Sequence, residues 1–278
     1  MNVNNEDFAE PKKNKNIVST IQQGRQALVR IPHLRKFFLS IPYCAPTYTK
    51  TLRVIKRLVF VPKFPKFKSD AEKLDPNDFD ALLDFALVEW GELIGPMQLR
   101  PEIRSLMELL KQRGVKRFME IGTANGGTLF LLCKSLGKGS AGISLDLPCD
   151  SFFGEYPKYK EPFYQSFAGE GQSLRLLRGD SHKPETLANV KGVLGEEKLD
   201  FLLIDGDHSY EGVKKDYEMY SPLVKEGGII AFHDIVVFPP ELHCDVHRFW
   251  NEVKLQSKSQ EFISDPKQTW AGIGIIFK

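Results

Sequence analysis

The sequence predicts an α/β fold in which helices cover both faces of a mostly parallel sheet. In the second half of the chain, five short apolar segments alternate with stretches of helical periodicity. The first segment runs directly into a glycine-rich turn, and acids with histidines follow the fourth and the fifth. Apolar runs of this length separated by helices are typical of buried parallel strands, and ligands bind at the carboxyl ends of such strands.

Local patterns predict the helices that precede the sheet. The run Asp75-Pro76-Asn77-Asp78 has the composition of a helix start, and apolar residues follow it at positions 79, 82, 83, 86 and 87. Pro101 and Glu102 are both favourable in a first turn, so a second helix is expected over residues 100–113.

The strands are expected at residues 117–121, 141–145, 173–177, 201–204 and 229–232. After a helix near Phe249, residues 261–264 and 271–277 fit a closing antiparallel pair, which brings the sheet to seven strands.

Charge divides the chain into unequal parts. Residues 1–68 carry 14 Lys and Arg against three acids, although the whole chain has a net charge of only +2. We expect a disordered tail over residues 1–16, a basic N-terminal extension over 17–74 and the main domain over 75–278. The bases of residues 17–68 fit a solvated extension packed on the domain, or a peripheral contact with an anionic membrane or an acidic partner.

Composition excludes several other classes of protein. Hydrophobic residues make up 42% of the chain, which allows one large α/β domain with an appendage. The four cysteines, at positions 44, 133, 149 and 244, lack the spacing of a zinc site or a disulfide framework. No apolar run is long enough to span a membrane and residues 1–16 are polar, so a cytoplasmic protein without an integral membrane segment is expected. The sequence leaves open whether the protein forms a homo-oligomer.

The glycine-rich turn after the first strand predicts a cofactor site. Gly122 and Gly126 let the backbone approach a ligand at the start of a helix, but the spacing matches neither a P-loop nor the dinucleotide pattern GxGxxG. Glu120 would repel a pyrophosphate and attract an ammonium group, which favours S-adenosylmethionine (SAM) over NAD. Asp146, at the end of the second strand, is placed to accept the ribose hydroxyls.

A second group of polar residues follows the fourth and fifth strands. Asp205 and His208 come after one strand, and His233 and Asp234 end the next, so all four should border one crevice. Such a group suits a divalent cation such as Mg²⁺, which would hold and acidify a substrate hydroxyl while His208 takes the proton. The structural alternative is that these residues cap helices or hydrogen-bond locally.

From Gln98 onward the sequence resembles the class I SAM-dependent methyltransferases, specifically the Methyltransferase 24-like group of macrolide-sugar O-methyltransferases and cephalosporin hydroxylase-like proteins, with catechol O-methyltransferase more distant. The stretches that carry the resemblance are Met119-Glu-Ile-Gly-Thr-Ala-Asn-Gly-Gly127, Arg178-Gly-Asp180-Ser181-His182, Ile204-Asp-Gly-Asp-His-Ser-Tyr-Glu-Gly-Val213, Gly227-Gly-Ile-Ile-Ala-Phe-His-Asp234 and Arg248-Phe-Trp250. The resemblance implies a Rossmann-like, seven-stranded methyltransferase sheet.

The resemblance also assigns roles to residues of this chain. Glu120, Gly122, Asn125 and Gly126 would hold the methionine end of SAM, Asp146 the ribose, and Asp180 with Ser181 the adenine. Asp205 and Asp234 would bind the metal with His233, and His208 would be the catalytic base. The departure is His233, since the metal-dependent sugar enzymes carry an acidic ligand at this position.

The expected activity is SAM-dependent O-methylation of a hydroxyl on a sugar, a natural product or another polar small molecule. The main alternative is a non-catalytic SAM- or nucleoside-binding module that the basic N-terminal region recruits to a membrane or an acidic partner. An NAD-dependent oxidoreductase is disfavoured by Glu120 with Gly122, and a nucleic-acid methyltransferase by the lack of an RNA-binding motif. Gln98, residues 152–156 and residues 238–240 are candidates for the acceptor pocket.

Overall fold

The computed structural model describes residues 57–148 and 156–278. The chain divides into two compact units, Met1–Val61 and Pro62–Lys278, and the second contains the whole sheet. The predicted tail, most of the predicted extension and acceptor-pocket positions 152–155 lie outside the described residues. Helix α4 (Phe64–Ala71) comes from the end of the basic segment and belongs to the second unit. The division at residues 74 and 75 stays a prediction.

Seven strands form one sheet in the order β3-β2-β1-β4-β5-β7-β6. The strands are β1 (Arg117–Ile121), β2 (Ala141–Asp146), β3 (Ser173–Arg178), β4 (Leu199–Ile204), β5 (Val224–His233), β6 (Lys258–Phe262) and β7 (Ile273–Phe277). Strands β1 to β5 pair in parallel, and β7 runs antiparallel to both of its neighbours. The predicted fold class is confirmed, and the carboxyl ends of β1, β2, β4 and β5 meet at one edge of the sheet.

Two strands differ from the sequence prediction by three residues or more at one end. Strand β6 was expected at residues 261–264 but covers Lys258–Phe262, because it is the outermost strand and most of its side chains are exposed. An exposed edge strand lacks the apolar alternation that marks a buried one. Strand β5 begins at the buried Val224, earlier than the apolar run at 229–232, because the exposed residues 225–227 interrupt its apolar pattern.

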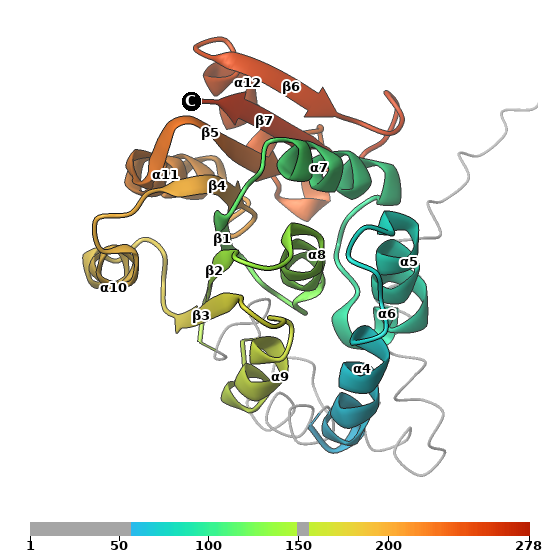
Figure 1. Ribbon diagram of the computed structural model, residues 1–278. Coiled ribbons are helices and arrows are strands. Elements are labelled where there is room, and N and C mark those ends of the chain that lie inside the picture. Colours follow the sequence, from blue (N-terminus) through green and yellow to red (C-terminus); the bar gives the residue numbers. More distant parts are fainter. Residues whose placement is uncertain (1–56, 149–155) are drawn as a thin grey trace, which may run out of the picture. The chain divides into compact units, whose positions relative to one another are not determined.

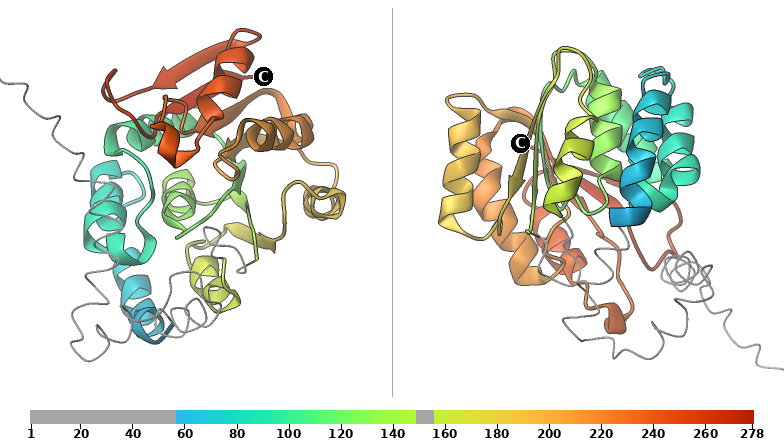
Figure 2. Two further views of the ribbon diagram at one scale, coloured as in Figure 1. Left: turned by 180° about the vertical axis from the view of Figure 1, so that it is seen from behind. Right: turned by 90° about the horizontal axis from the view of Figure 1, so that it is seen from below.

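Helices cover both faces of the sheet (Figure 1). Those in the described residues are α4, α5 (Phe79–Asp84), α6 (Gly91–Ile94), α7 (Arg100–Gln112), α8 (Gly127–Leu136), α9 (Glu161–Gln165), α10 (Pro184–Leu194), α11 (Tyr210–Tyr220) and α12 (Val246–Val253). Helices α10 and α11 lie on one face and α8 with α9 on the other, where α4 to α6 form an outer layer (Figure 2). None of the helices in the described residues is long and apolar enough to cross a bilayer.

Caps and aromatic packing fix the outer layer. The Asp78 side chain accepts a hydrogen bond from the Ala81 backbone N–H at 2.9 Å, so α5 begins at Phe79, and a π-helical turn (Phe85–Glu89) follows it directly. Phe67 of α4 is 1% exposed, and its ring centroid lies 5.5 Å from that of Phe130 in α8. Burying such a ring contributes roughly 1.5–3 kcal/mol to folding, so α4 is part of the core of this unit.

Candidate active site

The turn between β1 and α8 is shaped by close contacts that only glycine permits. Gly122 has φ +92°, and a Cβ atom there would lie 1.9 Å from the backbone oxygen of Asp205. Gly126 has φ +89°, and its Cβ would lie 2.6 Å from the ring of Tyr164. The Tyr164 hydroxyl donates to the carbonyl of Ala124 at 2.8 Å. The predicted glycines are therefore required by packing within the turn, whether or not a ligand is bound.

Glu120 ends β1 completely buried, at 0% exposure. Within the described residues, neither of its carboxylate oxygens has a partner in hydrogen-bonding geometry; the neighbouring Thr123 hydroxyl, which slightly lowers the pKa of Glu120, bonds the Ser144 hydroxyl at 2.6 Å. Burial, with the nearby negative charge of Asp205, raises the pKa of Glu120 well above its usual value. A buried carboxyl without partners costs folding free energy, so Glu120 has the properties of a group that awaits a cation.

The remaining cofactor-binding candidates lie around this turn. The Asp146 carboxylate accepts from the backbone N–H groups of Thr123 at 2.9 Å and Ala124 at 2.7 Å, so it orders the turn as well as facing it. Asn125 is exposed at the tip of the turn. Asp180 accepts from the His182 backbone N–H, and the Ser181 carbonyl accepts from the Tyr220 hydroxyl at 2.9 Å. Their roles with SAM stay predictions.

The second group of predicted residues forms one cluster of two carboxylates and two imidazoles. Nδ1 of His233 lies 3.0 Å from Oδ1 of Asp205 and 3.2 Å from Oδ1 of Asp234. Nδ1 of His208 lies 3.2 Å from Oδ2 of Asp234, and its Nε2 lies 3.6 Å from Asp205. The structure therefore brings together Asp205, His208, His233 and Asp234 as the sequence predicts, at the carboxyl ends of β4 and β5.

Charge within the cluster is balanced by these pairs. Burial raises the pKa of Asp205, but the charge of His233 and hydrogen bonds from both histidines outweigh burial and bring it to about 2. Burial lowers the pKa of His208, yet the bond to Asp205, with Cys244 and the charge of Asp234, raises it to about 11. The pKa of His233 is likewise raised well above its usual value by both carboxylates. The imidazoles and carboxylates of the cluster thus favour one another's charged forms against the cost of burial.

The cluster has the donors of a cation site. One ligand atom each from Asp205, His233 and Asp234 lies within 4.8 Å of the other two. Carboxylates suit Mg²⁺ and Mn²⁺, whereas imidazole suits Zn²⁺ and other transition metals. The residues fit a divalent ion on condition that His233 gives up its proton, since its Nδ1 now lies between the two carboxylates.

Two features of this edge of the sheet are not evident from the sequence. Asp234 has φ +61°, a left-handed conformation that is uncommon outside glycine and recurs at functional sites. Cys244 is buried beside His208 and Asp234, with its ligand atom within 4.8 Å of theirs. No motif surrounds Cys244; a backbone hydrogen bond from the Asp245 N–H to the His208 carbonyl, 2.8 Å long, helps to hold its loop here.

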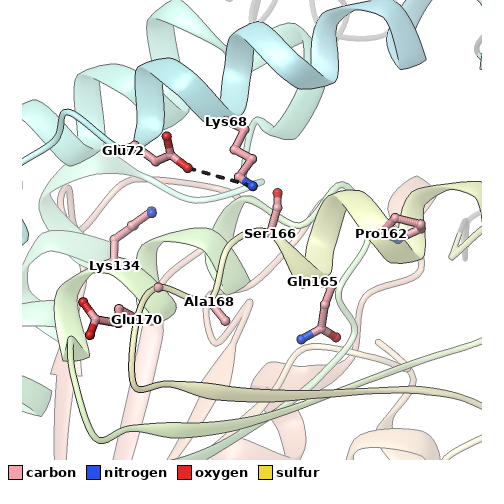
Figure 3. Close-up of a pocket in the computed structure, with 9 residues that line it drawn as sticks. Lys68, Glu72, Lys134, Pro162, Gln165, Ser166, Ala168 and Glu170 are labelled. Carbon is pink, nitrogen blue, oxygen red and sulfur yellow. Dashed lines mark ion pairs between the residues drawn. The ribbon is translucent and has the colours of Figure 1, made fainter.

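A surface hollow of about 560 Å³ lies elsewhere, between α4, the end of α8 and α9 (Figure 3). Charged side chains of both signs line it, and on the α4 side Lys68 pairs with Glu72, the residue that follows this helix, at 3.9 Å. None of the residues proposed for cofactor or acceptor lines this hollow, so we assign it no part in the site.

Comparison with known proteins identifies a matching family model and two relatives of similar sequence. Residues 119–235 match the family model of a methyltransferase domain. An uncharacterized protein of Sinorhizobium fredii is 27% identical over 58% of this chain and 17% of its own length. An uncharacterized protein of Acanthamoeba polyphaga mimivirus is 31% identical over 42% of this chain and 50% of its own length. The chain thus spans half or less of the length of these two curated relatives.

Among solved structures, the O-methyltransferase of Bacillus cereus in complex with S-adenosylhomocysteine (SAH) is similar, with a TM-score of 0.51 at 17% identity, over 75% of this chain and 94% of that one. This similarity concerns the fold. Residues 119–235 thus resemble a methyltransferase domain, and the likeness in fold to that O-methyltransferase extends over 75% of this chain.

Proposed function

We propose that this protein transfers the methyl group of SAM to a hydroxyl of a polar small molecule, such as a sugar or a natural product. The observation that carries the proposal is that two features lie at the same edge of the sheet. One is the buried acid Glu120, which has no hydrogen-bond partner in the described residues, and the other is the cluster of Asp205, His208, His233 and Asp234. The first can receive the cofactor's ammonium, and the second can handle the acceptor's hydroxyl and its proton.

The cofactor would lie along the carboxyl ends of β1 and β2. Its ammonium would meet Glu120, and its ribose hydroxyls would meet the Asp146 carboxylate, which already accepts two backbone N–H groups but retains lone pairs. The adenine would approach Asp180 and Ser181. The B. cereus O-methyltransferase of similar fold was solved with SAH bound, which supports a cofactor of this chemistry.

In the reaction, the acceptor oxygen attacks the methyl carbon, the carbon–sulfur bond breaks, and the products are the methyl ether, SAH and one proton. The hydroxyl proton has to leave, and His208 is the side chain at the cluster's outer side, with 43% of its side chain exposed. Because the cluster holds His208 in its charged form, it becomes a base only after passing its own proton to solvent.

A divalent ion is the second part of the proposal. Asp205, His233 and Asp234 would hold it, and it would supply positive charge that lowers the pKa of the acceptor hydroxyl. Such an ion would replace the charge that the imidazolium groups now provide beside the two carboxylates.

The experiment is a calorimetric titration with SAH, in buffer containing Mg²⁺ or Mn²⁺ or a chelator, on the wild type and on Asp146→Ala. We expect micromolar affinity in the wild type that Asp146→Ala weakens. Transfer of a labelled methyl group from SAM to a panel of hydroxylated acceptors then measures catalysis, and its loss with the chelator would establish the metal. Tight SAH binding without transfer to any acceptor would favour the non-catalytic binding module.

A further inference from the structure

Gln98 lies in the loop between α6 and α7, ahead of the segment that matches the methyltransferase model. Gln98 is 5% exposed, and its Nε2 lies 3.3 Å from Oδ2 of Asp205. Since a carboxylate only accepts, the amide nitrogen has to face Asp205, and this fixes which way the amide is turned. Its Oε1 is buried and has no hydrogen-bond partner among the residues described.

The loop that carries Gln98 packs directly on the glycine-rich turn. A Cβ atom at Gly127 would lie 2.1 Å from the carbonyl oxygen of Ile94 and 2.5 Å from Pro96. At its other end the loop reaches Asp205, whose backbone oxygen abuts Gly122 and whose charge raises the pKa of Glu120. The loop therefore runs from the start of α8 to the end of β4, the strand that pairs with β1.

Three buried acceptor atoms that form no hydrogen bond within the described residues thus have Asp205 as a common neighbour: the two carboxylate oxygens of Glu120 and Oε1 of Gln98. Native proteins leave few buried polar atoms unpaired, and each such atom indicates a donor that arrives from elsewhere. An ammonium group brings three N–H donors and one positive charge, which matches three acceptors with one acid among them. A hydroxyl brings a single donor and would leave the others unpaired.

We propose that Gln98 is a cofactor-binding residue whose Oε1 accepts a hydrogen bond from the methionine ammonium of SAM, while its Nε2 holds the Asp205 carboxylate in place. This inference rests on the proposed function and revises the expectation that Gln98 shapes the acceptor pocket. The α6–α7 loop would then take part in cofactor binding, and the bound cofactor would stabilise the contacts of this loop with the glycine-rich turn and the acid–imidazole cluster.

The test compares Gln98→Met, which keeps the length of the side chain, with Gln112→Met, an exposed position at the end of α7. Affinity is measured calorimetrically, in metal-free buffer, for SAH, for its decarboxylated analogue and for 5′-methylthioadenosine. The first two ligands carry the ammonium, and the third has the same nucleoside and sulfur without it. Thermal unfolding of each apo variant checks that the fold is kept.

We expect Gln98→Met to weaken SAH and the decarboxylated analogue about tenfold, the usual order for losing a hydrogen bond to a charged group, and to leave 5′-methylthioadenosine unchanged. Gln112→Met should match the wild type with all three ligands. Equal losses with all three ligands, or no loss with SAH, would overturn the role of Gln98. A loss confined to SAH would point instead to the carboxylate and would equally overturn it. If the wild type binds none of the ligands, the proposed function itself fails.

Discussion

The two ends of strand β4 carry aspartates in opposite situations. Asp200, near its start, accepts from the backbone N–H groups of Lys116 and Arg117, both at 2.7 Å, and pairs with Lys225 at 2.5 Å. Asp205, just past its end, faces two imidazoles and the amide of Gln98, next to a glutamate with no hydrogen-bond partner in the described residues. At the start of β4 the polar groups bond one another. Past its end, acceptor atoms remain without hydrogen-bond partners among the described residues.

This contrast separates groups that stabilise the fold from groups held ready for ligands. At Asp200 the pairing of β4 with β5 shifts register, and the carboxylate ties together the starts of β1, β4 and β5. At the opposite edge, Asp234 has a left-handed backbone and Glu120 is buried with no hydrogen-bond partner in the part of the chain that the structure describes, both of which lower stability. Exchanging the two kinds of acid for amides should therefore have opposite consequences.

The largest effect is expected from Asp205→Asn. Removing this charge leaves His233 and His208 with one carboxylate between them and takes away a proposed metal ligand. We expect methyl transfer to fall by about 10³-fold, or ~4 kcal/mol, within the range for loss of general acid–base or metal assistance. Asp207→Asn, in the same loop but outside the cluster, is the matched control. A fall of less than tenfold would remove Asp205 from the catalytic centre.

Asp200→Asn should act on stability alone. The amide oxygen can still accept from Lys116 and Arg117, but its NH₂ group then meets the Lys225 ammonium without a compensating charge. We expect a loss of about 2–3 kcal/mol in the free energy of unfolding, measured by urea titration, with the SAH affinity unchanged. An altered SAH affinity in a variant that remains folded would show that the two edges of the sheet are coupled.

Glu120→Gln tests the unpartnered acid against a partnered one. Because burial disfavours the charged form of Glu120 and raises its pKa, a neutral amide should leave stability nearly unchanged but weaken SAH by roughly 10- to 100-fold. The control is Glu102→Gln, since Glu102 is also buried but accepts from Ser264, Gln268 and Gly272 at 2.8–2.9 Å. That variant should lose stability and keep its affinity; the reverse pattern would contradict the assignment of Glu120.

The sequence predicts those parts of the site that lie at the ends of strands. Parallel strands place Glu120, Asp146, Asp205 and Asp234 at one edge, so their proximity follows from topology alone. Gln98 and Cys244 reach the site through loops, and their contacts depend on how those loops pack. The protonation of His208 and the orphaned oxygens of Glu120 are likewise invisible in a sequence, because they depend on burial and on neighbours from other strands.

The smallest expected effect is the pH dependence of the Asp200 contribution. Burial raises the pKa of Asp200, but hydrogen bonds from Lys225 and from the Arg117 and Lys116 backbones outweigh burial, so the net direction is downward. The facing groups are these three, and the Arg117 guanidinium itself pairs with Glu197 at 2.9 Å.

When the pKa of a group is lower in the folded than in the unfolded protein, the stability that it contributes is present above the unfolded pKa and is lost as pH falls through the folded pKa. The difference in unfolding free energy between wild type and Asp200→Asn should therefore stay constant from neutral pH to about pH 5 and then shrink on further acidification. A difference that is flat down to pH 3 would mean that the backbone hydrogen bonds, rather than the charge, stabilise this end of the sheet.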